Sequence, residues 1–259
     1  MHDLGKWAAY LVDAEARREA VNPITDLEPE LSADDAYQIQ ALVVEAKVAA
    51  GEFIVGAKLG LTSIAKQIAM RVEQPVYGVL MSGMALEVEH PLDCSKLIHP
   101  RVEPEIVFVL GDDLTGPGIT GHDVLDATRY LTCGLEVIDS RYSDFRFTYA
   151  DVVADNTSAS RFVLGAQRVR PSDITDLALI GCNLQTNSRV VASAAGAAIL
   201  GHPASAVALL ANWLGAQGGC LRRGTIVLSG GMTNAVPIRP GVCVSASFAQ
   251  LGTVTLRGV

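Results

Sequence analysis

The chain has 259 residues, 49% of them hydrophobic, and a formal net charge of −8. This size allows one large hydrophobic core, and the acidic balance argues against a nucleic-acid partner or an anionic membrane surface. No apolar run reaches the roughly 18 to 20 residues of a membrane span, and the start of the chain has acids where a secretory signal is apolar, so a cytoplasmic protein is expected. Five widely spaced cysteines without a C-x-x-C pair predict core thiols.

Two helices are expected in the N-terminal region, over residues 3–20 and 32–50. In the second, Ser32 and Asp35 have the spacing of a capping pair, apolar residues recur at helical spacing, and Gly51 ends the pattern. From residue 53 the pattern changes to short strands punctuated by glycine and proline, with the sequences FIVGAKLGL, PVYGVL, PEIVFVL and GLEVIDSRY.

A helix is expected over 121–131, capped by Thr120, followed by a hairpin around Asn187-Ser188 and an apolar helix over 203–218. The remaining residues to 259 have strand composition. The pattern predicts an α+β fold built on a curled or rolled mixed sheet with inserted helices. We expect a small helical N-terminal region over 1–52 and a β-roll domain over 53–259.

Acidic residues interrupt two otherwise apolar strands. Glu103 and Glu105 in RVEPEIVFVL share one strand face, and Glu136 lies in the middle of the strand GLEVIDSRY. Three oxygen ligands without nearby cysteine or histidine favour Mg²⁺ or Mn²⁺ over zinc. Alternating glutamates are also common on an exposed strand, and the spacing does not decide between these interpretations.

Two further segments carry polar side chains with more than one interpretation. Lys58 lies between glycines in an apolar strand, which allows close approach of a ligand but also fits an ordinary edge-strand lysine. The polar run VADNTSAS, residues 153–160, is either a turn or the lining of a site.

The segments GAKLGLTS, PRVEPEI, LEVIDSRY and VADNTSASRFVLG, in this order, resemble the hydratase/decarboxylase branch of the fumarylacetoacetate hydrolase superfamily. The similarity extends from about residue 4 to 259 and implies a fumarylacetoacetate-hydrolase-like β-roll or sandwich with a Mg²⁺ (or Mn²⁺) cofactor. It implies metal ligands at Glu103, Glu105 and Glu136, catalytic residues at Lys58, Val76 and Asp155, and substrate-binding residues at Leu59 and Ser158. For the far carboxylate of the substrate, Arg141 and Arg161 are candidates, and each also fits an ordinary surface arginine.

The branch contains two activities: hydration of 2-hydroxypenta-2,4-dienoate, and decarboxylation of 2-oxo-3-hexenedioate. Hydratases of this branch typically have Pro-Asp-Phe/Tyr-Gly where this chain has PVYG, residues 75–78, so Val76 favours the decarboxylase. A hydratase, a C–C hydrolase of fumarylpyruvate type and a catalytically silent partner of a hydratase stay open as alternatives. The resemblance also implies a 2-oxo dicarboxylate substrate, a homo-oligomer and a complex with the pathway hydratase.

Overall fold

The N-terminal region consists of two packed helices in the computed structural model, which describes residues 3–64, 67–68, 72 and 74–259. Helix α1 (Leu4–Arg17) begins after Asp3, whose side chain accepts a hydrogen bond from the Lys6 N–H. Helix α2 (Ala33–Ala49) begins with the predicted capping box of Ser32 and Asp35. Both predicted helices are confirmed and are shorter than expected at their ends.

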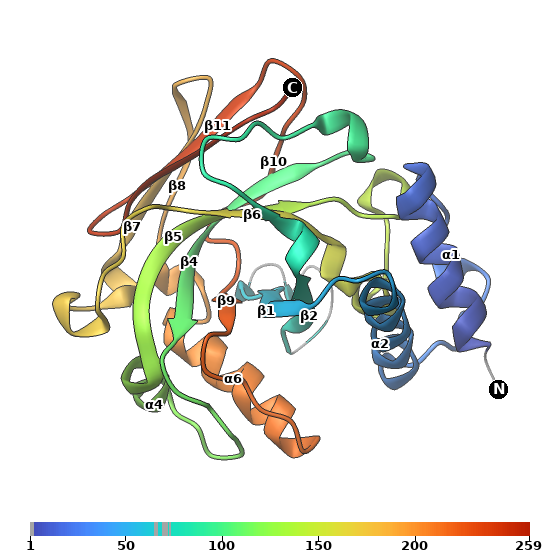
Figure 1. The fold of residues 1–259 in the computed structure, drawn as a ribbon, viewed down its shortest axis with the longest axis horizontal. Coiled ribbons are helices and arrows are strands. Elements are labelled where there is room, and N and C mark those ends of the chain that lie inside the picture. Colours follow the sequence, from blue (N-terminus) through green and yellow to red (C-terminus); the bar gives the residue numbers. More distant parts are fainter. Residues whose placement is uncertain (1–2, 65–66, 69–71, 73) are drawn as a thin grey trace.

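A curled mixed sheet dominates the rest of the chain (Figure 1). The order of its strands in the described part of the chain is β2-β1-β9-β4-β5-β6-β3, and β10 pairs with the start of β4. These strands are β1 (Ile54–Gly60), β2 (Val76–Met81), β3 (Ala85–Leu86), β4 (Arg101–Leu110), β5 (Thr128–Ile138), β6 (Ala159–Leu164), β9 (Ile226–Leu228) and β10 (Val236–Pro237). Most neighbours are antiparallel, but β1 pairs with β9 in parallel, and this pairing joins distant parts of the sequence.

A second sheet packs beside the first in the order β12-β11-β7-β8. Its strands are β7 (Gly181–Thr186), β8 (Arg189–Ala195), β11 (Cys243–Phe248) and β12 (Gly252–Arg257). The expected hairpin joins β7 to β8, with Asn187 and Ser188 in the left-handed region at φ 49° and 65°, as a tight two-residue turn requires. The predicted α+β fold with a curled sheet is confirmed.

The helix expected over 121–131 is shorter in the structure. Helix α4 (Gly121–Ala127) has the predicted Thr120 cap, but β5 begins at Thr128, so the helical prediction for 128–131 is wrong. Thr128, Tyr130 and Thr132 favour extended backbone, and they pair with β4 from Leu110 to Val107. Pairing with a long neighbouring strand outweighed the helical spacing of the apolar residues.

Helix α6 (Pro203–Ala216) belongs to the core. The segment Gly196–Ala216 that contains it is long and apolar enough to cross a membrane, so the statement that no such run exists is wrong. In the structure Ala204, Val207 and Ala211 of this helix are buried. They belong to the largest apolar cluster, which also contains residues of both sheets.

The N-terminal helices share a hydrophobic cluster with a distant segment. Trp7 of α1 and Ile39 of α2 are buried together with Tyr142 and with Val153 of α5 (Tyr149–Ala154). Figure 1 shows α1 and α2 on one side of the curled sheet. The division of the chain at residues 52 and 53 into separate domains stays a prediction.

Candidate active site

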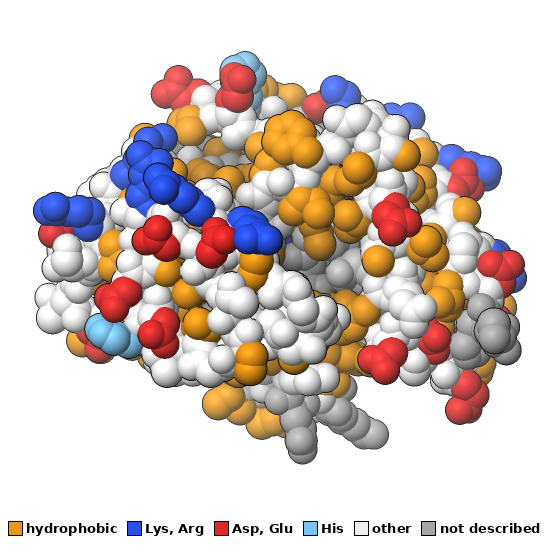
Figure 2. Space-filling view, turned by 60° about the horizontal axis from the view of Figure 1, so that its bottom comes forward, with side chains coloured by type: hydrophobic (Ala, Val, Ile, Leu, Met, Phe, Trp, Pro, Cys, Tyr) orange, Lys and Arg blue, Asp and Glu red, His pale blue; other side chains and the backbone are white. Residues whose placement is uncertain are grey.

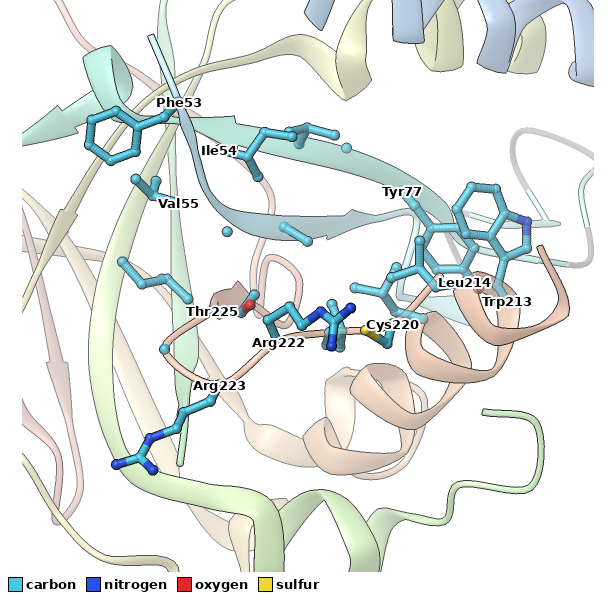
Figure 3. Close-up of a pocket in the computed structure, with 18 of the residues that line it drawn as sticks. Phe53, Ile54, Val55, Tyr77, Trp213, Leu214, Cys220, Arg222, Arg223 and Thr225 are labelled. Carbon is cyan, nitrogen blue, oxygen red and sulfur yellow. The ribbon is translucent and has the colours of Figure 1, made fainter. Parts of the chain in front are cut away.

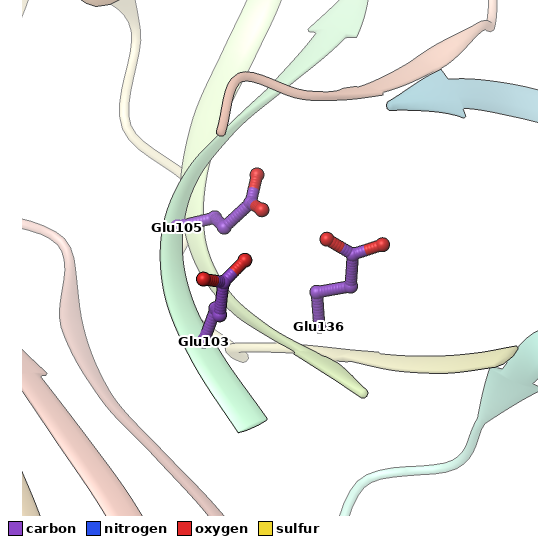
Figure 4. A group of neighbouring side chains, drawn as sticks. All are labelled: Glu103, Glu105 and Glu136. Atoms are coloured by element: carbon purple, nitrogen blue, oxygen red, sulfur yellow. The ribbon is translucent and has the colours of Figure 1, made fainter. Parts of the chain in front are cut away.

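Three glutamates converge on one face of the curled sheet (Figure 4). β4 and β5 are antiparallel with Glu103 directly opposite Glu136, and Glu105 lies two residues further along on the same face of β4. The three side chains are 9%, 0% and 1% exposed, so the exposed-strand alternative is wrong. Each offers a carboxylate oxygen, and these oxygens lie within 4.8 Å of one another.

The electrostatics of this cluster favour a bound cation. Burial, followed by repulsion from Glu136, raises the pKa of Glu105 well above its usual range, although the Gly230 N–H donates to Glu105 Oε2 at 2.6 Å. Burial also raises the pKa of Glu136, and the nearby Lys58 ammonium opposes this. Among the described residues, Glu105 Oε1 and Glu136 Oε2 are buried without a hydrogen-bond donor. These unpartnered oxygens suit a hard divalent cation such as Mg²⁺ or Mn²⁺.

Two consecutive glycines after β9 form the opposite wall of the carboxylate cluster. Gly230 has φ +117°, and a Cβ atom there would lie 2.0 Å from Thr62 Oγ1. A Cβ atom at Gly231 would lie 2.7 Å from Glu103 Oε2. The glycines therefore let the backbone approach the carboxylates closely. Sequence reasoning missed this contribution, although the pair GG after an apolar strand is a signal of close approach.

Lys58 joins the cluster from β1. Its ammonium forms an ion pair with Glu136, with Nζ 2.9 Å from Oε1, and donates to the Thr157 carbonyl at 3.1 Å. The side chain is buried and β1 lies between β2 and β9, so the edge-strand interpretation of this lysine is wrong. The Leu59 side chain belongs to the main apolar cluster, and strand alternation directs it away from Lys58, so only its backbone faces the site.

The polar run 153–160 forms a strained turn beside Lys58. Asn156, Thr157 and Ser158 have φ values of 47°, 52° and 58°. These values lie in the left-handed region of backbone conformation, which residues other than glycine rarely adopt. The Asn156 side chain binds both the N–H and the carbonyl of Val79, at 2.8 and 2.9 Å. Thr157, which sequence reasoning did not single out, has a buried hydroxyl without a partner among the described residues.

Arg141 and Asp155 hold this turn from behind. The Arg141 guanidinium donates to the Asp155 carboxylate and to the carbonyls of Asp139, Ala159 and Asp155, so four hydrogen bonds occupy it. Asp155 also accepts a hydrogen bond from Ser158 Oγ at 3.2 Å. Burial raises the pKa of Asp155 to about 6, against the lowering effect of the adjacent guanidinium.

The structure brings Val76 to the site face but not Arg161. Val76 pairs with Gly60 across β1 and β2, and a Cβ atom at Gly60 would lie 2.8 Å from Val76 Cγ2 and 4.0 Å from Lys58 Nζ. On β6, Arg161 lies opposite Val137, whereas Phe162 lies opposite Glu136. Because neighbouring side chains alternate, Arg161 is on the other face of the sheet from the carboxylates.

Comparison with known proteins agrees with this fold. Residues 79–257 match the fumarylacetoacetate (FAA) hydrolase C-terminal family, and the chain belongs to that family. It is 41% identical to a 4-oxalocrotonate decarboxylase of Pseudomonas putida, over 97% of this chain and 95% of the relative. It is 39% identical to a 2-hydroxyhexa-2,4-dienoate hydratase of Comamonas testosteroni, over 94% of this chain and 93% of that protein.

A solved structure extends the comparison to three dimensions. The 4-oxalocrotonate decarboxylase from Pseudomonas putida G7, complexed with magnesium and adipate, matches with a TM-score of 0.96 and 41% identity. The match covers 99% of this chain and 97% of that one. The resemblance to the hydratase/decarboxylase branch is therefore confirmed.

Proposed function

We propose that this protein decarboxylates 2-oxo-3-hexenedioate (4-oxalocrotonate) to 2-hydroxypenta-2,4-dienoate and CO₂, with Mg²⁺ as its cofactor. The observation that carries the proposal is the cluster of three buried carboxylates, in which Glu105 and Glu136 have oxygens without a hydrogen-bond donor among the described residues. Support comes from the relative of matching fold, whose structure contains magnesium and adipate, a dicarboxylate with the same number of carbon atoms as the proposed substrate.

Glu103, Glu105 and Glu136 would hold the cation, and Mn²⁺ would fit the same ligands. When bound, the ion supplies Lewis acidity that stabilises negative charge developing on the substrate's carbonyl oxygen. Lys58 is buried and fixed between Glu136 and the Thr157 carbonyl. Its ammonium can therefore stabilise the enolate or donate a proton from Nζ to the substrate without first having to be oriented.

Four other residues would position or contact the substrate. We assign Arg141 and Asp155 to holding the turn at 156–158, because four of the five guanidinium N–H groups are occupied within the protein. Ser158 Oγ donates to Asp155, which leaves its lone pairs to accept from a bound molecule. Leu59 would contribute its backbone. We do not assign the far carboxylate to Arg161, because its position opposite Val137 puts its side chain on the other face of the sheet.

Hydration of a 2-hydroxydienoate is the second candidate, because a hydratase is also a close relative. Val76 is 1% exposed and apolar, and a carboxylate placed near it would be poorly solvated, which favours loss of CO₂. We expect Val76→Asp to lower the kcat of decarboxylation about tenfold or more, a loss of about 1.4 kcal/mol, and Val76→Ile to change it little. Equal activity of V76D and wild type would remove Val76 from the mechanism.

The direct test uses both substrates. Protein with and without Mg²⁺, and the Glu105→Gln variant, are incubated with 2-oxo-3-hexenedioate and separately with 2-hydroxypenta-2,4-dienoate. CO₂ release and ultraviolet absorbance are followed. Metal-dependent CO₂ release from the first compound, absent in E105Q, is the expected result. Loss of the second compound without CO₂ release from the first would identify a hydratase, and no reaction with either would support a silent partner.

We also propose that the protein forms a homo-oligomer and a complex with a hydratase. A homo-oligomer and a complex with a hydratase would suit a product that is an unstable dienol. Analytical ultracentrifugation of the protein alone and mixed with a hydratase of the same pathway measures both. A sedimentation coefficient of a monomer in each case would contradict this part.

A further inference from the structure

A cavity of about 750 Å³ lies on the opposite side of the β1–β2 pair from the carboxylate cluster (Figure 3). Its walls are β1, β2, the end of α6 and the segment 220–226. Ala57 and Tyr77 line it, and Lys58, the chain neighbour of Ala57, points its side chain to the other face of the strand. Nothing in the proposed decarboxylation uses this cavity.

The walls are mainly apolar and partly rigid. Trp213 packs against Tyr77 with ring centroids 4.9 Å apart, and against Tyr37 at 4.8 Å. Val55 and Leu214 add aliphatic surface, and Phe53, 65% exposed, lies at the rim. A concave apolar site of this volume with a small number of polar groups has the character of a small-molecule site.

The charged side chains that line the cavity are positive. Among the described lining residues, the charged side chains are those of Arg222 and Arg223. In Figure 3 the Arg222 side chain extends into the cavity, whereas that of Arg223 points away from it. Figure 2 shows a hollowed face with hydrophobic side chains on one side and Lys or Arg side chains on the other. Arg222 contacts Asp113 at 2.9 Å in an exposed pair, which contributes little energy. A ligand carboxylate can therefore replace Asp113 when the apolar body of the same molecule is held in the cavity.

We propose that this cavity binds an apolar molecule ending in a carboxylate, with the carboxylate on the Arg222 guanidinium and the apolar body against Trp213 and Tyr77. The planar guanidinium matches a carboxylate in a two-point contact. Gln40, which also lines the cavity, donates to the carbonyls of Tyr77 and Val153 at 2.9 and 3.0 Å. A ligand here would therefore touch the back of the Lys58 strand pair and a residue bonded to α5.

The test uses decanoate as the probe and decan-1-ol as the uncharged comparison. The chain has two tryptophans, and Trp7 is buried in the N-terminal cluster, so a change in emission on binding reports Trp213. We expect saturable binding of decanoate with a change in emission that is absent in Trp213→Phe. Isothermal titration calorimetry gives the dissociation constants of all variants.

Three variants test the role of the Arg222 guanidinium. Asp113→Asn frees Arg222 and should tighten decanoate binding, and the double variant D113N/R222Q should weaken it about tenfold relative to D113N, as expected for loss of a charge-assisted hydrogen bond. The dissociation constant of decan-1-ol should differ by less than twofold between the wild type and these variants. Arg17→Gln, which removes an exposed arginine paired with Asp13 on α1, is the matched control and should bind as wild type.

The test also separates this proposal from the proposed function. Glu105→Gln should bind decanoate as tightly as wild type, with or without Mg²⁺, whether or not the protein is a decarboxylase. Absence of saturable binding, equal affinity of D113N and D113N/R222Q, or binding that requires Mg²⁺ and Glu105 would each overturn it.

Discussion

Glu105 is a buried carboxylate in an unfavourable electrostatic environment. It is fully buried, one of its oxygens has no donor there, and Glu136 and Glu103 both repel it. We expect Glu105→Gln to raise the free energy of unfolding of the metal-free protein by about 1–3 kcal/mol, because a neutral amide avoids the cost of keeping this buried acid either charged or protonated above its usual pKa. Calorimetry with and without Mg²⁺ measures this.

The same variant should lose stabilisation by the metal. Mg²⁺ should raise the melting temperature of the wild type and leave that of E105Q unchanged, since ligands that bind only the native state stabilise it. Glu19→Gln is the control, because Glu19 is exposed and lies outside the helices and strands. Mg²⁺ should raise its melting temperature by as much as that of the wild type. A Mg²⁺ response in E105Q equal to that of the wild type would show that the cation binds elsewhere.

The raised pKa values of Glu105 and Glu136 predict a dependence of metal affinity on pH. A cation needs both carboxylates ionised, so Mg²⁺ affinity should rise as pH rises through their native pKa values, with protons released on binding. In the metal-free protein the native state holds more protons than the unfolded state, so stability should fall over the same range. Titration calorimetry in two buffers of different ionisation enthalpy counts the protons, and a count of zero would contradict the prediction.

At the scale of elements, the strained turn at 156–158 depends on a residue that precedes it by 15 positions. Arg141 is buried and supplies the bonds that hold the backbone around Asp155. Arg141→Met would leave the Asp155 carboxylate buried without its partner, and we expect a loss of about 3–5 kcal/mol in the free energy of unfolding. Urea denaturation measures this loss.

A double variant shows whether the loss comes from the unpaired charge. R141M/D155N removes both partners, so it should be more stable than R141M alone, because no uncompensated carboxylate remains. If the double variant is as unstable as R141M, the carbonyl contacts of the guanidinium, and not the ion pair, hold the turn.

The strands and their acids could be predicted from sequence because the signals are local. Alternation put Glu103 and Glu105 on one face, and β-branched residues marked β4 and β5. The turn could not be predicted, because Thr157 and Ser158 have no intrinsic preference for left-handed backbone, and the contacts of Arg141 and Asn156 that hold the turn come from distant residues. The face occupied by Arg161 follows from pairing across β5 and β6, which includes a bulge, and no local pattern encodes it.

At the scale of the whole molecule, the order of the strands was beyond local reasoning. The parallel pairing of β1 with β9 joins residues 56–58 to 226–228, and composition does not specify the partner of an apolar strand. The residue pattern predicted a curled or rolled mixed sheet, and the similarity to a known family added the specific fumarylacetoacetate-hydrolase-like fold. The role of Gly231 likewise depends on a contact with β4, which is far away in the sequence.

The shared N-terminal cluster predicts that the two parts of the chain are not independent. Trp7 and Ile39 pack with Tyr142 and Val153, so removing residues 1–52 would expose this apolar surface. We expect the fragment 53–259 to be aggregated or to melt well below the full chain, because hydrophobic burial contributes about 25 cal/mol per Å². Circular dichroism melting compares them, and a fragment as stable as the full chain would establish 53–259 as an autonomous domain.

The parallel contact of β1 with β9 also has a consequence for how the molecule forms. The backbone donor to Glu105 and the wall beside Glu103 come from Gly230 and Gly231, close to the end of the chain. Contacts of such large sequence separation form late and slow the folding of a domain. During synthesis the glutamates would thus be made long before Gly230 and Gly231 pack against them. Tight binding of Mg²⁺ would therefore begin only after the C-terminal third of the chain has folded onto β4.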